Sequence, residues 1–137
     1  MISGQIKLPG DKSISHRASL FAAFNERTSI FTNYSLNDDC RATLLCLKKL
    51  GISYELTGSK LTIKGKHPSK WQKPSSALDA GNSGTTARLI SGLLAILPFD
   101  TELIGDSSLS KRPMKRIQQC ESAIIVGIND RHRFGHV

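Results

Sequence analysis

The spacing of apolar and polar residues predicts that the chain opens with a strand, a helix and a second strand. Gln5–Leu8 alternates between polar and apolar residues and runs into Pro9 and Gly10, which is typical of a short strand followed by a turn. Over Ser13–Phe24 the apolar residues recur at helical spacing, and they predict one buried face made of Ile14, Ala18, Phe21 and Ala22. Thr28–Thr32 alternates again and is rich in β-branched residues, which predicts a strand.

A second helix and a hairpin follow in the pattern. Asp38 or Asp39 is expected to cap a helix that Gly51 ends. The buried positions of that helix are predicted to be Cys40, Leu44, Leu47 and Leu50. Ile52–Leu56 and Lys60–Lys64 are two short strands joined by a turn, as in a hairpin. The predicted order to this point is βαβαββ.

The second half of the chain begins the same pattern again. A loop rich in proline and serine over His67–Ser76 leads to a short extended stretch at Leu78–Ala80. The nearly apolar stretch Thr85–Leu97 predicts a helix buried on all sides, and Thr101–Ile104 predicts a further strand. The pattern therefore predicts one complete α/β unit and part of a second.

Composition narrows the class of protein. With 137 residues, of which 39% are hydrophobic, the chain has enough material for one modest domain. Its 19 basic and 11 acidic residues give a net charge of +8, which suits nucleic acid, an acidic membrane or anionic small molecules. Only 6% of the residues are aromatic and no basic cluster is interleaved with them, which argues against nucleic acid.

Membrane and secretory features are absent from the pattern. The longest apolar stretch, Leu89–Phe99, is interrupted by polar residues, glycine and proline and is too short for a span. Met1–Pro9 has no apolar segment followed by a cleavage site, so no signal peptide is predicted. We therefore expect no membrane partner and a cytoplasmic location.

The cysteines and histidines do not suggest a metal site. The three cysteines are Cys40, Cys46 and Cys120, and their spacing lacks the paired pattern of a zinc site. The four histidines are scattered along the chain. We expect reduced thiols in the core and no bound metal.

One spaced pattern recurs three times, each time after a predicted strand. Gly10–Arg17, Gly81–Arg88 and Gly105–Arg112 share a leading glycine, later serine or threonine hydroxyls, and a final arginine. A strand that turns through glycine into a helix presents free N–H groups and the positive end of the helix dipole, which together bind anions. Arginine adds a bidentate contact to phosphate or carboxylate. A structural reading, in which glycine ends a strand and a polar residue caps a helix, fits any single copy equally well.

The first copy carries an additional cation, Lys12, beside Ser13. The spacing of a Walker loop is absent, as is the glycine pattern of a dinucleotide-binding turn. The pattern therefore favours phosphate or carboxylate groups of small molecules over nucleotides.

These segments resemble a known family. Leu8–Arg17, Leu78–Leu89 and Gly105–Met114 are similar, in order, to three signatures of 5-enolpyruvylshikimate-3-phosphate synthases. The resemblance implies transfer of the enolpyruvyl group of phosphoenolpyruvate to the 5-hydroxyl of shikimate 3-phosphate, on the route to chorismate and the aromatic amino acids. A related transferase acting on a UDP-amino sugar has asparagine after the motif lysine, so Ser13 favours the shikimate enzyme.

The resemblance also implies a fold and a set of contacts. The family fold has two inside-out α/β barrel domains, each built from βαβαββ units. In the family, the opening strand of the chain joins a sheet of the other domain. Ile2–Leu8 is therefore expected to have no sheet to join in this chain. Lys12 is implied as a catalytic residue that contacts both substrates. The other implied contacts are Ser13 and Arg17 for shikimate 3-phosphate, and Asn82, Gly84 and Arg112 for phosphoenolpyruvate. No cofactor or metal is implied, and a monomer is expected.

The resemblance divides the chain at residue 116. Residues 1–116 are expected to form part of an N-terminal domain, and residues 117–137 a divergent tail. We favour a frameshift as the origin of this tail. The alternative is a true tail that forms a helix or a strand at Ala123–Ile128. The family's general acid and base lie outside this chain, so the chain alone is expected to be inactive. The alternatives are a non-catalytic phosphate-binding fragment and, third, a basic nucleic-acid-binding domain.

Three further residue positions have simple structural interpretations. His16 is expected to form a hydrogen bond or to pack, although it lies within the strongest motif. Asp38 and Asp39 are interpreted as helix caps and not as a catalytic pair. Trp71 is expected to be a local packing anchor.

Overall fold

A computed structural model describes residues 3–114, 124–128 and 131–135. The first half contains α1 (Lys12–Phe24), β1 (Thr28–Phe31), α2 (Asp38–Lys49), β2 (Ser53–Thr57) and β3 (Lys60–Lys64). The second half contains a 3-10 helix (Pro68–Lys70), β4 (Leu78–Asp79), α3 (Gly84–Leu94), β5 (Thr101–Ile104), α4 (Ser107–Ser110), β6 (Ile124–Ile128) and β7 (Arg131–Gly135). These elements confirm the predicted α/β class.

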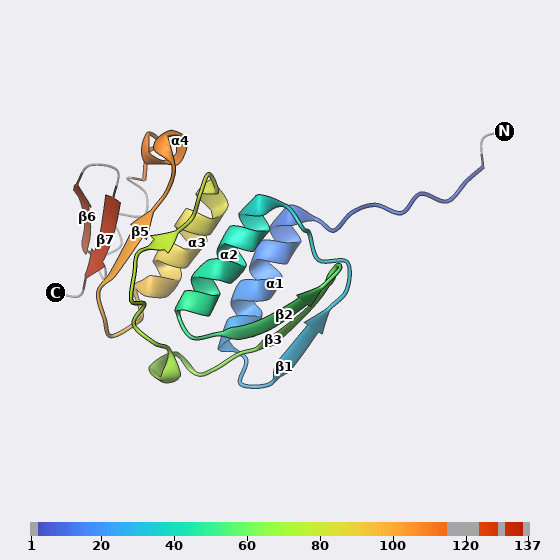
Figure 1. Ribbon diagram of the computed structural model, residues 1–137, viewed down its shortest axis with the longest axis horizontal. Coiled ribbons are helices and arrows are strands. Elements are labelled where there is room, and N and C mark those ends of the chain that lie inside the picture. The colour runs from blue at the N-terminus through green and yellow to red at the C-terminus, as the bar shows by residue number, and fades with distance from the viewer. Residues whose placement is uncertain (1–2, 115–123, 129–130, 136–137) are drawn as a thin grey trace.

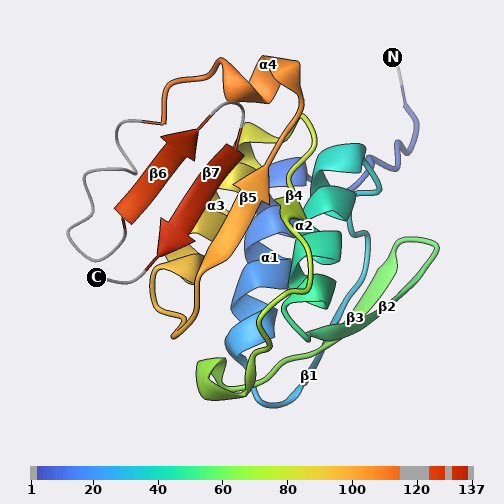
Figure 2. The same ribbon diagram turned by 60° about the vertical axis from the view of Figure 1, so that its left-hand side comes forward.

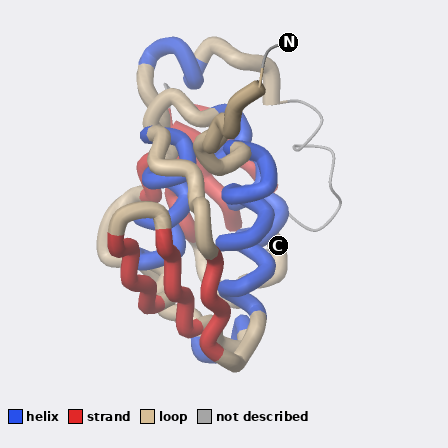
Figure 3. The backbone as a smooth tube through the Cα atoms, turned by 90° about the vertical axis from the view of Figure 1, so that its right-hand side faces the viewer, coloured by secondary structure: helices blue, strands red, loops and turns tan. Residues whose placement is uncertain are grey.

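The helices α1, α2 and α3 form a layer between two sheets (Figures 1 and 2). The first sheet has the order β1-β3-β2, and both pairings are antiparallel. It lies against one side of the helices, as Figure 3 shows. The second sheet has the order β4-β5-β7-β6, in which only β4 and β5 are parallel. Helices inside and sheets outside is the arrangement that an inside-out barrel requires.

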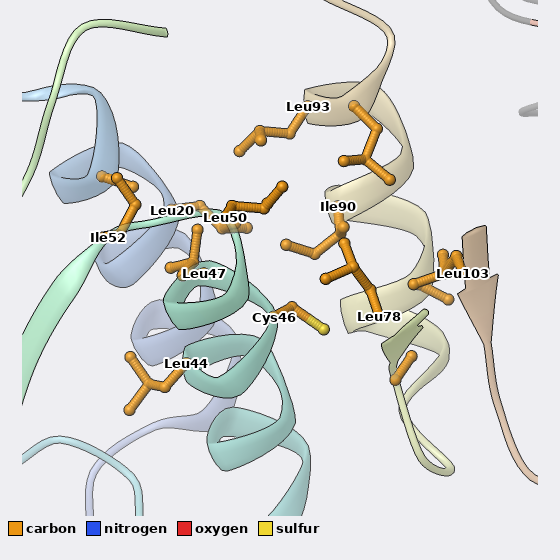
Figure 4. Close-up of a cluster of buried hydrophobic side chains, with 14 of the residues drawn as sticks. Leu20, Leu44, Cys46, Leu47, Leu50, Ile52, Leu78, Ile90, Leu93 and Leu103 are labelled. Carbon is orange, nitrogen blue, oxygen red and sulfur yellow. The ribbon is translucent and has the colours of Figure 1, made fainter. Parts of the chain in front are cut away.

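The hydrophobic core lies along α2 and extends to both sheets (Figure 4). Its fully buried large side chains include Leu44, Leu47, Leu50, Ile52, Leu61, Ile63, Leu78, Ile90, Leu97 and Leu103. The predicted buried positions of α2 are confirmed, and the helix ends where Gly51 takes a positive φ of 89°. Burial of apolar surface on this scale is the main stabilising contribution to the fold.

The predicted buried face of α1 is wrong in two of its four positions. Ile14 and Phe21 are 69% and 73% exposed. Ser15, His16 and Ser19 are buried in their place, alongside Leu20 and two alanines. The serine hydroxyls are satisfied by backbone partners, and buried polar groups that form hydrogen bonds avoid the cost of desolvation.

The predicted opening strand at Gln5–Leu8 is also wrong. Residues 3–11 have no strand structure, and Ile6 and Leu8 are 85% and 71% exposed. The segment extends away from the helical layer in Figure 1. A single strand has unsatisfied backbone groups unless a neighbouring strand pairs with it, and within the described residues no strand does so here.

Two further helix predictions need correction. The cap of α2 is Asn37, whose side chain accepts a hydrogen bond from Cys40 N at 2.8 Å, and not Asp38 or Asp39. α3 ends at Leu94 and is not buried on all sides, because Arg88 and Gly92 are exposed. One edge of the helical layer is therefore open.

Other local predictions are confirmed. Trp71 packs on Phe24 with ring centroids 5.2 Å apart, and its indole N–H donates to Lys66 O at 2.9 Å. Cys40 and Cys46 are buried free thiols, and burial raises the pKa of both. Cys120 lies outside the described residues.

The strand β6 occupies most of residues 123–128. A helix or strand was expected there under the second of the two alternatives for the tail, a true tail. The strand pairs with β7, which in turn pairs with β5, so β6 is an edge strand of the second sheet. Among the described residues, no helix has the length and apolar character needed to cross a bilayer.

Candidate functional site

The three recurring motifs meet at one end of the helical layer, where α1, α3 and α4 begin (Figures 1 and 2). Each helix is capped by a side chain that the motif supplies. Asp11 accepts from Ile14 N, Ser83 from Thr86 N and Asp106 from Leu109 N, at distances of 2.7, 3.0 and 2.7 Å. The sequence therefore anticipated the turn into a helix at all three motifs, although the first has no strand before it.

In the first motif, two cations lie on the opening turns of α1. The Lys12 ammonium forms an ion pair with the Asp39 carboxylate at the start of α2, and its side chain is still 48% exposed. Arg17 Nη1 donates to Ser13 O at 3.0 Å, and Ser13 and Arg17 are both exposed. Lys12, Ser13 and Arg17 thus share one accessible surface.

The second and third motifs lie side by side because the strands before them are parallel neighbours. β4 and β5 pair through Leu78 with Leu103 and through Asp79 with Ile104. Just beyond the strands, Asp106 N donates to Gly81 O at 2.9 Å. Carboxyl ends of parallel strands meet at one edge of a sheet, which is a common position for ligand sites.

Asn82 connects these two motifs through its side chain. Its amide Nδ2 donates to Asp106 Oδ2 at 2.6 Å, and its Oδ1 accepts from Arg112 Nη2 at 3.0 Å. The hydrogen bond from Asn82, with that from Leu109 N, lowers the pKa of the Asp106 carboxyl. Asp106 therefore remains ionised, and Asn82 holds Arg112 beside the start of α3.

Gly84 leaves room for two guanidinium groups. A Cβ atom at this position would lie 2.7 Å from Arg88 Nη1 and 3.0 Å from Arg112 Nη1. Arg88 Nη1 also donates to Gly84 O at 3.2 Å. Two cations therefore converge over the N-terminus of α3, an arrangement suited to a phosphate or carboxylate group.

The structure adds three residues to those singled out in the sequence. Arg88 ends the second copy of the recurring pattern, whose arginines were expected to contact anions, but it was not named as a substrate contact. Asp106 lies within the third copy and was assigned no role. Asp39 was interpreted as a cap, and nothing in its sequence context indicated its ion pair with Lys12. Its carbonyl accepts from the Thr86 hydroxyl at 3.1 Å, so Asp39 connects the first motif with the second.

The assembled site is rich in donors and cations. Four cationic side chains lie near the helix N-termini: Lys12, Arg17, Arg88 and Arg112. The nearby carboxylates are already engaged, because Asp39 forms an ion pair and Asp106 accepts hydrogen bonds. Within the described part of the chain, no three histidine, cysteine or acidic side chains gather as a metal-ligand group. The arrangement is suited to binding anions.

Comparison with known proteins identifies the family. Residues 1–132 match the family model of EPSP synthase (3-phosphoshikimate 1-carboxyvinyltransferase). The chain belongs to the EPSP synthase family. It is 49% identical over 116 residues to a 3-phosphoshikimate 1-carboxyvinyltransferase of Bacillus cytotoxicus, and 48% identical over 116 residues to one of Desulfitobacterium hafniense.

The fold of this chain also occurs within solved EPSP synthases. The chain superposes on an EPSP synthase of Acinetobacter baumannii with a TM-score of 0.87 and 38% identity, over 96% of this chain and 32% of the other. The Bacillus and Desulfitobacterium alignments cover 85% of this chain. This chain spans 27% of the length of those EPSP synthases. The division at residue 116 stays a prediction.

Proposed function

We propose that this chain forms the first part of the substrate site of a 3-phosphoshikimate 1-carboxyvinyltransferase. The complete reaction moves the enolpyruvyl group of phosphoenolpyruvate to the 5-hydroxyl of shikimate 3-phosphate and releases phosphate. The observation that carries the proposal is the convergence of three anion-binding motifs, with their lysine and arginines, at one end of the helical layer. Because both substrates are polyanions, a site must offset their mutual repulsion before they can react.

The proposed contacts to shikimate 3-phosphate are Lys12, Ser13 and Arg17. The hydroxyl of Ser13 and the guanidinium of Arg17 lie one helical turn apart on the exposed start of α1. Arginine supplies a planar pair of donors to a phosphate, and lysine supplies a mobile point charge. The helix N-terminus adds free N–H groups to the same anion.

The proposed contacts to phosphoenolpyruvate are Lys12, Asn82, Gly84 and Arg112. Gly84 allows the ligand to approach the backbone at the start of α3, where the Arg88 and Arg112 guanidinium groups converge. Lys12 is proposed as the catalytic residue of this set. Its ammonium would offset negative charge on both substrates, which is electrostatic stabilisation.

The test is isothermal titration of the 137-residue chain with shikimate 3-phosphate and, separately, with phosphoenolpyruvate. Lys12→Ala is expected to weaken both ligands by about tenfold or more, because a hydrogen bond to a charged group contributes ~1.5–3 kcal/mol. Arg17→Ala should weaken shikimate 3-phosphate selectively, and Arg112→Ala should weaken phosphoenolpyruvate selectively.

A matched control is Lys64→Ala, since Lys64 is an exposed lysine at the end of β3 and pairs across the sheet with Thr28 and Ser53. It removes the same charge from a different surface and should leave both affinities unchanged. If the folded wild-type chain binds neither ligand, or if Lys64→Ala weakens binding as much as Lys12→Ala, the proposal is wrong.

A second candidate function is anion binding without catalysis by this chain. It is favoured because the carboxylates near the motifs are already engaged by other groups. Asp39 is paired with Lys12, and Asp106 accepts hydrogen bonds from Asn82 and Leu109 N. A proton-transfer group must reach the reacting atoms with a suitable pKa. Measurement of phosphate release from the two substrates separates these candidates: turnover by the chain would rule out the non-catalytic one.

A further inference from the structure

A row of polar side chains runs through the buried centre of the helical layer. His16 Nδ1 lies 2.7 Å from Thr43 Oγ1, and Thr43 Oγ1 lies 2.8 Å from Thr86 Oγ1. The Thr86 hydroxyl also lies 2.8 Å from Ser83 Oγ. The exposed fractions of these four residues are 0%, 0%, 0% and 1%. None of them was predicted to act together from the sequence.

This row connects helices that carry different motifs. α2 packs against both α1 and α3, and in Figure 1 it is drawn beside each of them, so hydrogen bonds from α2 to the two helices can fix the spacing of the first and second motifs. Thr43 lies on α2 and contacts a residue of each neighbour, His16 on α1 and Thr86 on α3. Its hydroxyl therefore joins the two motif helices by hydrogen bonds.

The same row reaches the surface residues of the site. Thr86 Oγ1 donates to Asp39 O, and the Asp39 carboxylate pairs with Lys12. Ser83 caps α3 by accepting from Thr86 N and directly precedes Gly84. A displacement of Thr43 or Thr86 would therefore be passed to Lys12 on one side and to the backbone at Gly84 on the other.

A polar row in this position has a specific physical consequence. Aliphatic side chains pack without strong direction and leave helices free to settle in slightly different registers. Hydrogen bonds between short hydroxyls fix distance and direction, and a buried hydroxyl left without a partner costs about 1–3 kcal/mol. The row thus favours one relative placement of α1, α2 and α3.

We infer that Thr43 and Thr86 are positioning residues that set the spacing between the first and second anion motifs. They do not contact substrate themselves. The inference rests on the proposed function, because the spacing matters only if one ligand is held by both motifs. Phosphoenolpyruvate, with a phosphate and a carboxylate, is such a ligand, whereas inorganic phosphate needs one motif only.

The test compares these two ligands in Thr43→Val, which keeps the shape of the side chain and removes the hydroxyl. We expect phosphoenolpyruvate to bind about tenfold more weakly and inorganic phosphate to change less than about twofold, because misplacing one half of a site penalises only ligands that use both halves. Thr43→Ser should restore the affinity. The double variant with Thr86→Val should lose less affinity than the sum of the two single losses, since both changes remove the same contact between Thr43 and Thr86.

The matched control is Thr101→Val on β5. Thr101 is 3% exposed, and its Oγ1 has no hydrogen-bond partner within the described part of the chain. The same substitution in an equally buried position should leave both ligands unaffected. Equal weakening of phosphoenolpyruvate and phosphate in Thr43→Val, or no weakening of either, would overturn the inference.

A second measurement keeps the two proposals distinguishable. If the wild-type chain binds neither ligand, the proposed function fails, and the positioning role is then decided by NMR residual dipolar couplings of the free chain. The inference predicts that Thr43→Val rotates or shifts α1 relative to α3 and that Thr101→Val does not. An unchanged orientation in Thr43→Val would show that packing alone sets the spacing.

Discussion

Two neighbouring helices, α1 and α2, differ in how well their apolar pattern predicts the buried face. α2 buries Cys40, Leu44 and Leu47 at positions that its apolar pattern predicts, together with Cys46 and Thr43. α1 buries Ser15, His16 and Ser19 and turns Ile14 and Phe21 outward. Helical periodicity therefore predicted both helices, but it identified the buried face correctly only in α2, where apolar side chains fill most of the buried positions.

The difference follows from what each helix packs against. The buried hydroxyls of α1 bond to its own backbone and to neighbouring segments: Ser35 N donates to Ser15 Oγ at 2.9 Å. Phe21 instead lines an open groove of about 290 Å³ between α1 and α3, with Leu89 and Ile96 on the opposite wall. The outward apolar face of α1 is thus shared with α3 at the open edge of the layer.

The largest expected effect comes from the apolar helix. Leu47→Ala should lower the free energy of unfolding by ~2–5 kcal/mol, because Leu47 is fully buried and its loss leaves a cavity. Phe21→Ala removes a larger side chain that is 73% exposed, and it should change stability by less than about 0.5 kcal/mol. Urea unfolding of both variants provides the comparison. A larger loss in Phe21→Ala than in Leu47→Ala would mean that the outward face is covered in solution.

The next effect tests how α1 is held at its start. A Cβ atom on Gly10 would lie 1.9 Å from Asn33 O, a backbone atom that cannot move aside independently. Gly10→Ala should therefore cost ~2 kcal/mol of stability by overpacking. Gly92→Ala on α3 meets no atom within 4 Å and should stabilise the chain by ~0.5–1 kcal/mol, since alanine favours a helix. Thermal unfolding of the two variants should shift in opposite directions, and a shared direction would contradict this account.

Sequence reasoning found the elements and motifs more reliably than the contacts between them. The hairpin, α2 and β5 follow local periodicity, so their positions were predictable from a few adjacent residues. The opening strand was wrong because a strand needs a partner that local pattern does not supply. The pairing of Lys12 with Asp39 and the alignment of Thr43 with Thr86 join residues distant in sequence, so no local spacing could indicate them.

A smaller effect is expected from the polar side of α1. Ser15→Ala removes the acceptor of Ser35 N and should cost about 1 kcal/mol, since a buried donor loses its partner. Ser13→Ala is the matched change on the exposed side of the same helix and should stay within about 0.5 kcal/mol. Equal effects at the two serines, measured by urea unfolding, would mean that the buried hydroxyls do not stabilise α1.

The smallest effect is a pH dependence at His16. Burial, first, and then the neighbouring Lys12 and Arg17 charges lower the pKa of His16 below 6.5, while Asp39 opposes the shift. His16 Nε2 also has no hydrogen-bond partner within the described residues, so a proton added there would be buried unpaired.

The sign of this dependence follows from proton binding. Below about pH 6.5 the unfolded chain binds a proton at His16 that the folded chain resists, so stability falls as the pH decreases from about 6.5 toward the lowered pKa. His16→Gln keeps a polar side chain without a titrating group and should flatten this part of the profile. Urea unfolding at about pH 7.5 and about pH 5.5 tests both chains. An equal loss of stability in the wild type and in His16→Gln would assign the pH dependence to other groups. It would mean that protonation of His16 in the buried face of α1 does not change the free energy of unfolding.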